Sequence, residues 1–256
     1  MRINHALAPQ PARIYMEGVH TGDTRRWRRR MVLAAAALGW IVAARVAPAD
    51  ETPGPHGAHD ATARHSFEDV DRWVPVFDDP ARDAWQKPAD AVAALQLRPG
   101  MRVADLGAGT GYFSRYLAAA VGDSGTVFAV DTEPGFVAHL RERAEHEHTP
   151  NIVPVLASAD NPRLPAGSID LVLIVDTVHH IDDRINYLRR LQRVLKPGGR
   201  VAVIDFKKQP DIPVGPPLEH KLARAQVVEE FTGAGYRLVR EPDILPYQYF
   251  LIFRPS

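Results

Sequence analysis

Apolar residues follow a regular pattern from Phe67 to the carboxyl terminus of this 256-residue chain. Short apolar runs of strand length alternate with longer segments in which apolar residues recur every three or four positions, as on one face of a helix. Strands are predicted at residues 103–106, 126–130, 152–156, 169–175, 200–206, 236–240 and 248–254. Helices are predicted at residues 89–97, 112–121, 135–146, 184–195 and 218–233.

The order of these segments predicts the fold class. Strands that alternate with helices at this spacing build a parallel sheet through right-handed crossovers, with helices on both faces. The run 169–175 is almost continuously apolar, as expected of a strand covered on both faces. The last two strands are joined through Pro242 and Pro246 without a helix, so they should pair antiparallel. We therefore expect an α/β, doubly wound sheet.

The amino-terminal segment has a different composition. Five arginines at residues 25–30 precede an apolar run at 31–44, and a small-x-small tripeptide ends at Ala49. This order is typical of a secretory signal, with cleavage expected after Ala49, and 14 apolar residues fall short of the roughly 20 that a membrane span needs. Two alternatives stay open. Residues 31–44 could act as an uncleaved membrane anchor, or the protein could be cytoplasmic with its start site misassigned, since Met16 and Met31 are further candidate starts.

Composition then divides the chain and narrows its chemistry. Residues 1–49 form the signal-like or anchor segment, the Pro-, Gly-, Ala- and His-rich residues 50–66 should form a flexible linker, and residues 67–256 a folded domain. Lys plus Arg and Asp plus Glu both number 31, so the chain has no global positive field of the kind that binds nucleic acid. The absence of cysteine excludes thiolate ligands and a cysteine nucleophile. We expect no nucleic-acid partner and no metal site.

The segment 105–111 reads DLGAGTG and lies between a predicted strand and a predicted helix. At Gly107, Gly109 and Gly111 the missing side chains let the backbone turn tightly and approach a ligand, while the helix amino terminus offers free N–H groups. The spacing is one residue shorter than the G-x-G-x-x-G dinucleotide fingerprint. Asp131 ends the next strand, where a carboxylate can accept hydrogen bonds from ribose hydroxyls. The pattern predicts a nucleotide-bearing ligand.

On these residues the chain resembles the class I S-adenosylmethionine-dependent methyltransferases. The resemblance covers roughly residues 84–255. It is carried by VADLGAGTGYFS at 103–114, VFAVDTEP at 127–134, SAD at 158–160, DLVLIVDTVHHI at 170–181 and LKPGGRVAVIDF at 195–206. It implies a Rossmann-like, doubly wound sheet of seven strands, mostly parallel with the last strand antiparallel, in a methyltransferase domain at 67–256.

The same resemblance implies S-adenosyl-L-methionine as cofactor and assigns roles to single residues. Gly107 and Gly109 would approach its methionine part and Asp105 would lie near its amino group. Asp131 would hold the ribose hydroxyls, Asp160 would reach the adenine amino group, and Asp176 would border the methionine and the acceptor. The expected cofactor contacts are Asp105, Gly107, Ala108, Gly109, Gly111, Asp131, Thr132, Asp160 and Asp176.

Methyl transfer mainly requires alignment, together with removal of a proton from a hydroxyl or amine acceptor. His179 and His180 follow the fourth strand at the carboxyl edge of the sheet, where such folds bind ligands, and a neutral imidazole there could act as the base. We expect at most one of them to be catalytic, since the other could cap the loop. Further candidates to shape the acceptor pocket are Trp85, Gln86, Lys87, Asp205, Lys207, Lys208, Tyr247, Gln248 and Tyr249.

No long insertion interrupts the predicted strands, so a small-molecule acceptor is expected. Two other functions fit a strand, a glycine turn and a later carboxylate. One is a nicotinamide-dependent oxidoreductase, against which the short glycine spacing and the antiparallel tail argue. The other is a non-catalytic module that binds S-adenosylmethionine without turnover. The pattern leaves the oligomeric state open.

Overall fold

The computed structural model of the chain describes residue 67 and residues 69–256. The signal-like or anchor segment 1–49, the linker 50–66 and the membrane association through residues 31–44 lie outside the described residues, so these expectations stay predictions. Within the described part of the chain, no helix is both long and apolar enough to cross a membrane.

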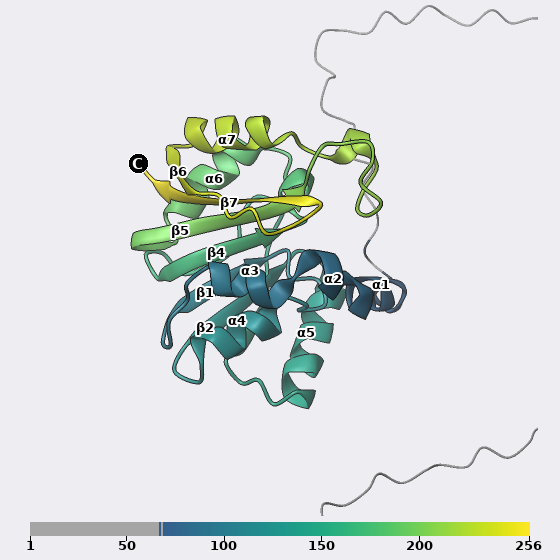
Figure 1. The fold of residues 1–256 in the computed structure, drawn as a ribbon. Helices are drawn as coiled ribbons and strands as arrows, with labels where there is room; N and C mark the ends of the chain where they lie inside the picture. The colour runs from purple at the N-terminus through teal and green to yellow at the C-terminus, as the bar shows by residue number, and fades with distance from the viewer. Residues whose placement is uncertain (1–66, 68) are drawn as a thin grey trace, which may run out of the picture. The chain divides into compact units, whose positions relative to one another are not determined.

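Seven strands form one sheet, whose strand order is β3-β2-β1-β4-β5-β7-β6 (Figure 1). The strands are β1 Arg102–Leu106, β2 Thr126–Asp131, β3 Ile152–Leu156, β4 Ile169–Val175, β5 Leu195–Phe206, β6 Tyr236–Arg240 and β7 Gln248–Pro255. The strands from β1 to β5 pair in parallel. β7 runs antiparallel to both of its neighbours, β5 and β6. The predicted seven-stranded sheet with an antiparallel last strand is confirmed.

Helices cover both faces of the sheet. They are α1 Val70–Phe77, α2 Asp83–Gln86, α3 Pro88–Ala94, α4 Ser114–Val121, α5 Pro134–His146, α6 Arg184–Gln192 and α7 Arg224–Gly233. One buried cluster packs α6 and α7 on the sheet, and a second packs α3 and α4 on its other face. All of β4 except the half-buried Asp170 is buried between these layers, which explains its nearly continuous apolar run.

Several predicted boundaries were wrong. The helix expected at 112–121 begins at Ser114, because residues 110–113 complete the glycine turn. The strand expected at 200–206 begins at Leu195, which pairs with Ile169 before a bulge in the ladder. The helix expected at 184–195 therefore ends at Gln192.

The helix expected at 218–233 is broken in two. A single 3-10 turn at Leu218–His220 is followed by extended backbone at Lys221 and Ala223 before α7 begins. The Lys221 side chain is buried, with its ammonium 5.7 Å from the centre of the Phe206 ring, and this contact draws the chain inward where the helix is interrupted.

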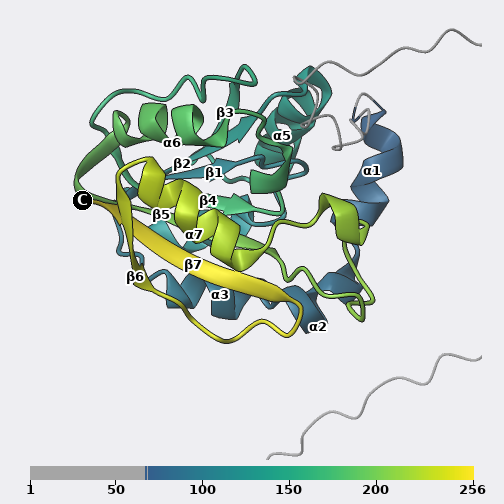
Figure 2. The ribbon, with the colours of Figure 1, turned by 90° about the horizontal axis from the view of Figure 1, so that it is seen from above.

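Two segments far apart in the sequence lie together at the carboxyl edge of the parallel strands. Figures 1 and 2 place α1 and the segment 207–223 at the same end of the sheet. Asp78, at the end of α1, is held from two sides: Thr110 Oγ1 donates to Oδ1 at 2.8 Å and Arg143 Nη1 to Oδ2 at 2.7 Å. These bonds fix α1 over the end of the glycine turn.

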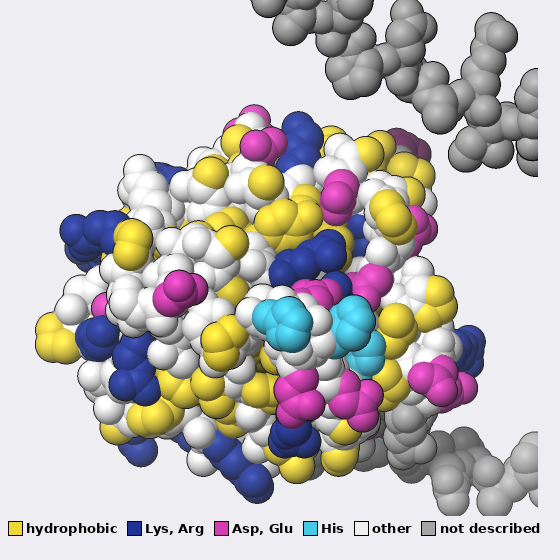
Figure 3. All heavy atoms as spheres, turned by 90° about the horizontal axis from the view of Figure 1, so that it is seen from below, with side chains coloured by type: hydrophobic (Ala, Val, Ile, Leu, Met, Phe, Trp, Pro, Cys, Tyr) yellow, Lys and Arg dark blue, Asp and Glu magenta, His cyan; other side chains and the backbone are white. Residues whose placement is uncertain are grey.

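Acidic and basic side chains are interspersed on the face of the molecule seen in Figure 3. Neither sign of charge therefore dominates this face of the molecule.

Candidate active site

A cavity of about 530 Å³ lies at the carboxyl ends of β1, β2 and β4. α1, the start of α5 and the segment 207–223 also contribute to its walls. The predicted site residues that line it are Asp105, Gly107, Ala108, Gly109, Asp131, Thr132, Asp176, His179 and His180. The structure thus brings together all the predicted site residues except Gly111 and Asp160.

The glycine turn between β1 and α4 has a left-handed backbone, with φ of +77° at Gly107 and +53° at Gly109. A Cβ atom at Gly107 would lie 2.2 Å from Thr177 Oγ1, so glycine is required where the two strand ends meet. The Gly109 N–H donates to Asp131 Oδ2 at 2.8 Å and ties the turn to the end of β2. A ligand in the cavity can therefore approach bare backbone.

Gly111 and Asp160 lie away from the cavity lining. A Cβ atom at Gly111 would lie 2.8 Å from Leu140 Cδ2, so this glycine lets α5 pack against the turn. Asp160 is exposed, and Ser158 Oγ donates to its carboxylate at 2.9 Å. The role assigned to Asp160 toward an adenine amino group stays a prediction.

Two carboxylates flank the glycine turn. Asp105 is buried, and this burial raises its pKa to about 6 although Ser114 Oγ donates to Oδ2 at 2.7 Å. Burial also raises the pKa of Asp131, against the opposing effect of hydrogen bonds from the N–H groups of Glu133 and Gly109. Both groups are costly to hold ionised without a cation, so this part of the cavity favours a positively charged ligand.

Asp176 follows β4 in a left-handed conformation, with φ of +51°. Gln86 Nε2 donates to Oδ2 at 2.8 Å and Gln248 Nε2 to Oδ1 at 2.5 Å, so both oxygens have an amide donor. Arg82 Nη2 in turn donates to Gln86 Oε1 at 2.6 Å, which links α2 to the end of β4. Burial, and next the charge of Asp205, raise the pKa of Asp176 to about 7.

The two histidines have different environments. His179 is buried, and its Nδ1 lies 2.9 Å from Oδ2 of the fully buried Asp205, at the end of β5. Burial alone would lower the pKa of His179, but its hydrogen bond to Asp205 and the nearby negative charges raise it above the ordinary value. His180 is exposed at the cavity rim, and its ring meets the Phe67 ring edge-on at 5.8 Å. His179 therefore has a buried carboxylate that can orient its ring.

An aromatic wall closes one side of the cavity. We use this name for Phe67, Trp73, Phe77 and Phe136. Trp73 stacks on Phe77 at 5.4 Å between ring centres, and Phe77 lies 5.8 Å from Phe136 of α5. Together these rings give the cavity an apolar, aromatic surface.

The aromatic wall was not predicted from the sequence. The pairing of His179 with Asp205 was also not predicted, although His179 follows β4 and Asp205 lies near the end of the neighbouring strand β5. Among the further pocket candidates, Trp85 instead packs against Phe206 and Tyr247, at 5.8 and 6.4 Å between ring centres. Gln86 and Gln248 act on the cavity indirectly, because they hold Asp176.

Comparisons with known proteins agree with this geometry. A family model for a methyltransferase domain matches residues 104–203, which include the glycine turn and both histidines. The ubiquinone/menaquinone biosynthesis C-methyltransferase UbiE of Shewanella frigidimarina is 34% identical over 123 residues, which are 48% of this chain and 48% of that protein. The protein of the same name from Vibrio campbellii is 35% identical over 112 residues, 43% of each chain. The chain thus spans about half the length of the curated relatives it matches.

Solved structures match over a longer stretch. A SAM-dependent methyltransferase from Aquifex aeolicus superposes with a TM-score of 0.69 at 28% identity, covering 72% of this chain and 97% of that one. The CcbJ methyltransferase from Streptomyces caelestis has a TM-score of 0.57 at 18% identity, covering 72% and 96%, and shows the likeness of fold alone.

Proposed function

The chain belongs to the class I S-adenosylmethionine-dependent methyltransferases, and from this premise we propose that it transfers a methyl group from S-adenosylmethionine to a small-molecule acceptor. The observation that carries the proposal is that the glycine turn and the buried His179–Asp205 pair line or border one cavity. The glycine turn suits cofactor binding, and the His179–Asp205 pair suits removal of a proton from the acceptor.

The residues present fit this cofactor. The left-handed Gly107 and Gly109 leave bare backbone in the cavity lining, and the Asp131 carboxylate lies at the end of β2. The raised pKa of Asp105 means that a positive charge beside it would favour its ionised form. When bound, S-adenosylmethionine would supply an electrophilic methyl group next to these carboxylates. The role of Asp131 would be to accept hydrogen bonds from hydroxyl groups of the ligand.

His179 is the proposed base. Its Nδ1 faces the Asp205 carboxylate, which would hold the proton on Nδ1 and leave Nε2 as the acceptor. In that tautomer Nε2 can take a proton from an acceptor hydroxyl, amine or activated C–H, and the buried Asp205 carboxylate would stabilise the resulting imidazolium. Asp205 acts through His179 and is a positioning residue.

For the methyl acceptor we propose a chemical class and no single compound. The aromatic wall favours a flat, apolar molecule, and the relatives that match half of this chain are named as C-methyltransferases of ubiquinone and menaquinone biosynthesis. Hydroxylated aromatic compounds are therefore the first acceptors to test. An acceptor of this kind would stack on the wall and present an ionisable group to His179.

The test is release of S-adenosylhomocysteine by the full-length protein from S-adenosylmethionine, with a panel of hydroxylated aromatic compounds and with fractionated cell extract. We expect release that requires an acceptor and that falls to background in Gly107→Ala. If S-adenosylmethionine binds but no acceptor in the panel or extract supports release above that background, the non-catalytic binding module is the better function.

A further inference from the structure

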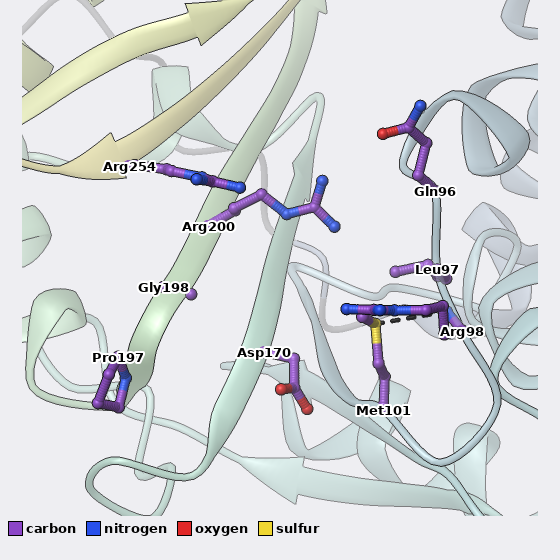
Figure 4. A pocket seen from close by; sticks show the side chains of 10 residues that line it. Gln96, Leu97, Arg98, Met101, Asp170, Pro197, Gly198, Arg200 and Arg254 are labelled. Carbon is purple, nitrogen blue, oxygen red and sulfur yellow. Dashed lines mark hydrogen bonds between the residues drawn. The ribbon is translucent and has the colours of Figure 1, made fainter.

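A second cavity, of about 600 Å³, lies at the opposite edge of the sheet, near the amino ends of the parallel strands. Its walls come from the loop after α3, from the start of β5 and from the end of β7. Figure 4 shows that Arg200 and Arg254 extend into it from neighbouring strands, while Arg98 extends toward it from the facing loop. Three guanidinium groups therefore converge on one cavity that the proposed methyl transfer does not use.

Internal contacts explain part of this arginine cluster, by which we mean Arg98, Arg200 and Arg254. Arg200 Nη2 donates to the Leu95 carbonyl at 2.9 Å, at the carboxyl end of α3, where a cation is favourable. No comparable contact explains the other two arginines. Within the described residues, no hydrogen bond, ion pair or ring contact involves the guanidinium group of Arg98 or Arg254.

The carboxylate that lines this cavity already has partners within the chain. Asp170 is the acidic residue among those that line the cavity, and its Oδ2 accepts from Lys196 Nζ at 2.7 Å and from the Arg102 N–H at 2.8 Å. Burial lowers the pKa of Arg200, and the positive charges of Arg254, Arg240 and Arg98 lower it further. The cluster therefore carries positive charge that the chain itself does not balance.

The sheet adds to this excess of charge. Arg254 of β7 lies directly opposite Arg237 of β6, and like charges in that position destabilise a strand pair. A bound anion would relieve this repulsion. Arg237 is exposed and lies outside the cavity lining, so the relief would act through Arg254.

We propose that the arginine cluster binds a phosphate group, carried either by a soluble small molecule or by a phospholipid headgroup. Planar guanidinium groups match phosphate oxygens with paired hydrogen bonds, and three of them around one cavity can surround a doubly charged anion. Leu97, Met101 and Pro197 supply an apolar wall for the uncharged part of the ligand. This inference is independent of the methyl-transfer site at the other edge of the sheet.

The first test is a calorimetric titration of the full-length protein with pyrophosphate as the probe. We expect binding that Arg98→Gln and Arg254→Gln each weaken about tenfold or more, as the loss of one charge-assisted contact predicts. The matched control is Arg193→Gln, which removes the same charge from an exposed position outside the cavity and should leave the affinity unchanged. Arg98 and Arg254 are exposed, so both variants should fold, and melting curves check this.

Vesicles distinguish the two sources of the phosphate group. Binding of each protein to phosphatidylglycerol vesicles is compared with binding to phosphatidylcholine vesicles, and all variants keep the same arginines at residues 25–30. Weaker vesicle binding in Arg98→Gln and Arg254→Gln assigns the cavity to a headgroup, and unchanged vesicle binding assigns it to a soluble ligand. Absence of pyrophosphate binding, or equal weakening in Arg193→Gln, overturns the proposal. S-adenosylhomocysteine binding should be the same in all of these proteins, which separates this outcome from failure of the proposed function.

Discussion

The two edges of the one sheet carry opposite chemistry. At the carboxyl edge, the cavity is lined by Asp105, Asp131 and Asp176 together with the aromatic wall. At the amino edge, the other cavity is lined by the arginine cluster, and its one lining carboxylate is paired with Lys196. The difference teaches that the formal net charge of the whole chain does not indicate which charged side chains gather at each cavity.

The two edges also differ in how the backbone is shaped. At the carboxyl edge, left-handed residues and a clash-limited glycine bring the backbone against the ligand site. At the amino edge, long flexible side chains reach into the cavity from regular strands and one loop. We therefore expect the carboxyl edge to respond sharply to small changes of shape, and the amino edge to respond mainly to changes of charge.

The largest effect is expected from Gly107→Ala. The new Cβ atom would lie 2.2 Å from Thr177 Oγ1 in a left-handed backbone, so the turn must shift out of the cofactor position. Affinity for S-adenosylhomocysteine should fall about 100-fold or more by calorimetry. Gly122→Ala is the control, because its φ of +64° is also positive but the space around its Cβ is open, and it should keep the affinity. Equal losses in both variants would show that strain alone, and not position, was responsible.

The next effect concerns His179. Removal of the base in His179→Ala should lower kcat by roughly 10²- to 10⁴-fold, while S-adenosylhomocysteine still binds.

Because the base must be neutral, the wild-type rate should rise with pH through an inflection that lies above the ordinary histidine pKa, since Asp205 raises the pKa of His179. Asp205→Asn should move that inflection to lower pH. An unshifted inflection in Asp205→Asn would contradict the proposed role of the pair, and His180→Ala serves as the exposed comparison.

A smaller effect, on the free energy of unfolding, is expected from Asp105→Asn. Its folded-state pKa of about 6 lies above the ordinary value of 3.8, so its ionisation opposes folding. Protonated Asp105 therefore makes its full contribution to the free energy of unfolding below about pH 4. This contribution, of up to about 3 kcal/mol, is lost as the pH rises through about 6. Asp105→Asn should raise the free energy of unfolding of the ligand-free protein at pH 8 but not at pH 4. Denaturation by urea at both pH values measures this, with the exposed Asp123→Asn as control; the same change at both pH values would refute it.

The smallest effect is expected at the contact that holds α1. Asp78→Asn removes the ion pair with Arg143, which is partly buried, so release of α1 should weaken cofactor binding about fivefold, equivalent to about 1 kcal/mol, with little change in kcat. Glu147→Gln removes the other partner of the same arginine, at 2.8 Å, without touching α1. A similar weakening in Glu147→Gln would mean that α1 is not what the Asp78 contact secures.

Much of the carboxyl edge was predictable from the sequence because its signals are local. A glycine turn between a strand and a helix, with Asp131 at the end of the next strand, fixes backbone shape and chemistry within about 25 residues. The antiparallel tail followed from the missing helix between the last two strands. The break before α7 was not predictable, because it depends on the burial of Lys221 against a ring fifteen positions away.

The arginine cluster at the amino edge could not be predicted from the sequence pattern. Arg98, Arg200 and Arg254 lie far apart along the chain and come together only through strand order and register. The same is true of Gln86 and Gln248, which meet at Asp176 from opposite ends of the domain. Such sites depend on tertiary pairing, whereas hydrophobic periodicity reports on single elements.

The most direct test of the central claim is a pair of calorimetric titrations of the full-length protein, one with S-adenosylhomocysteine and one with NADH. The glycine turn, with its short spacing and its carboxylates, predicts saturable binding of S-adenosylhomocysteine and none of NADH at the same concentrations. Tight binding of NADH without binding of S-adenosylhomocysteine would contradict the assignment of the cavity at the carboxyl edge.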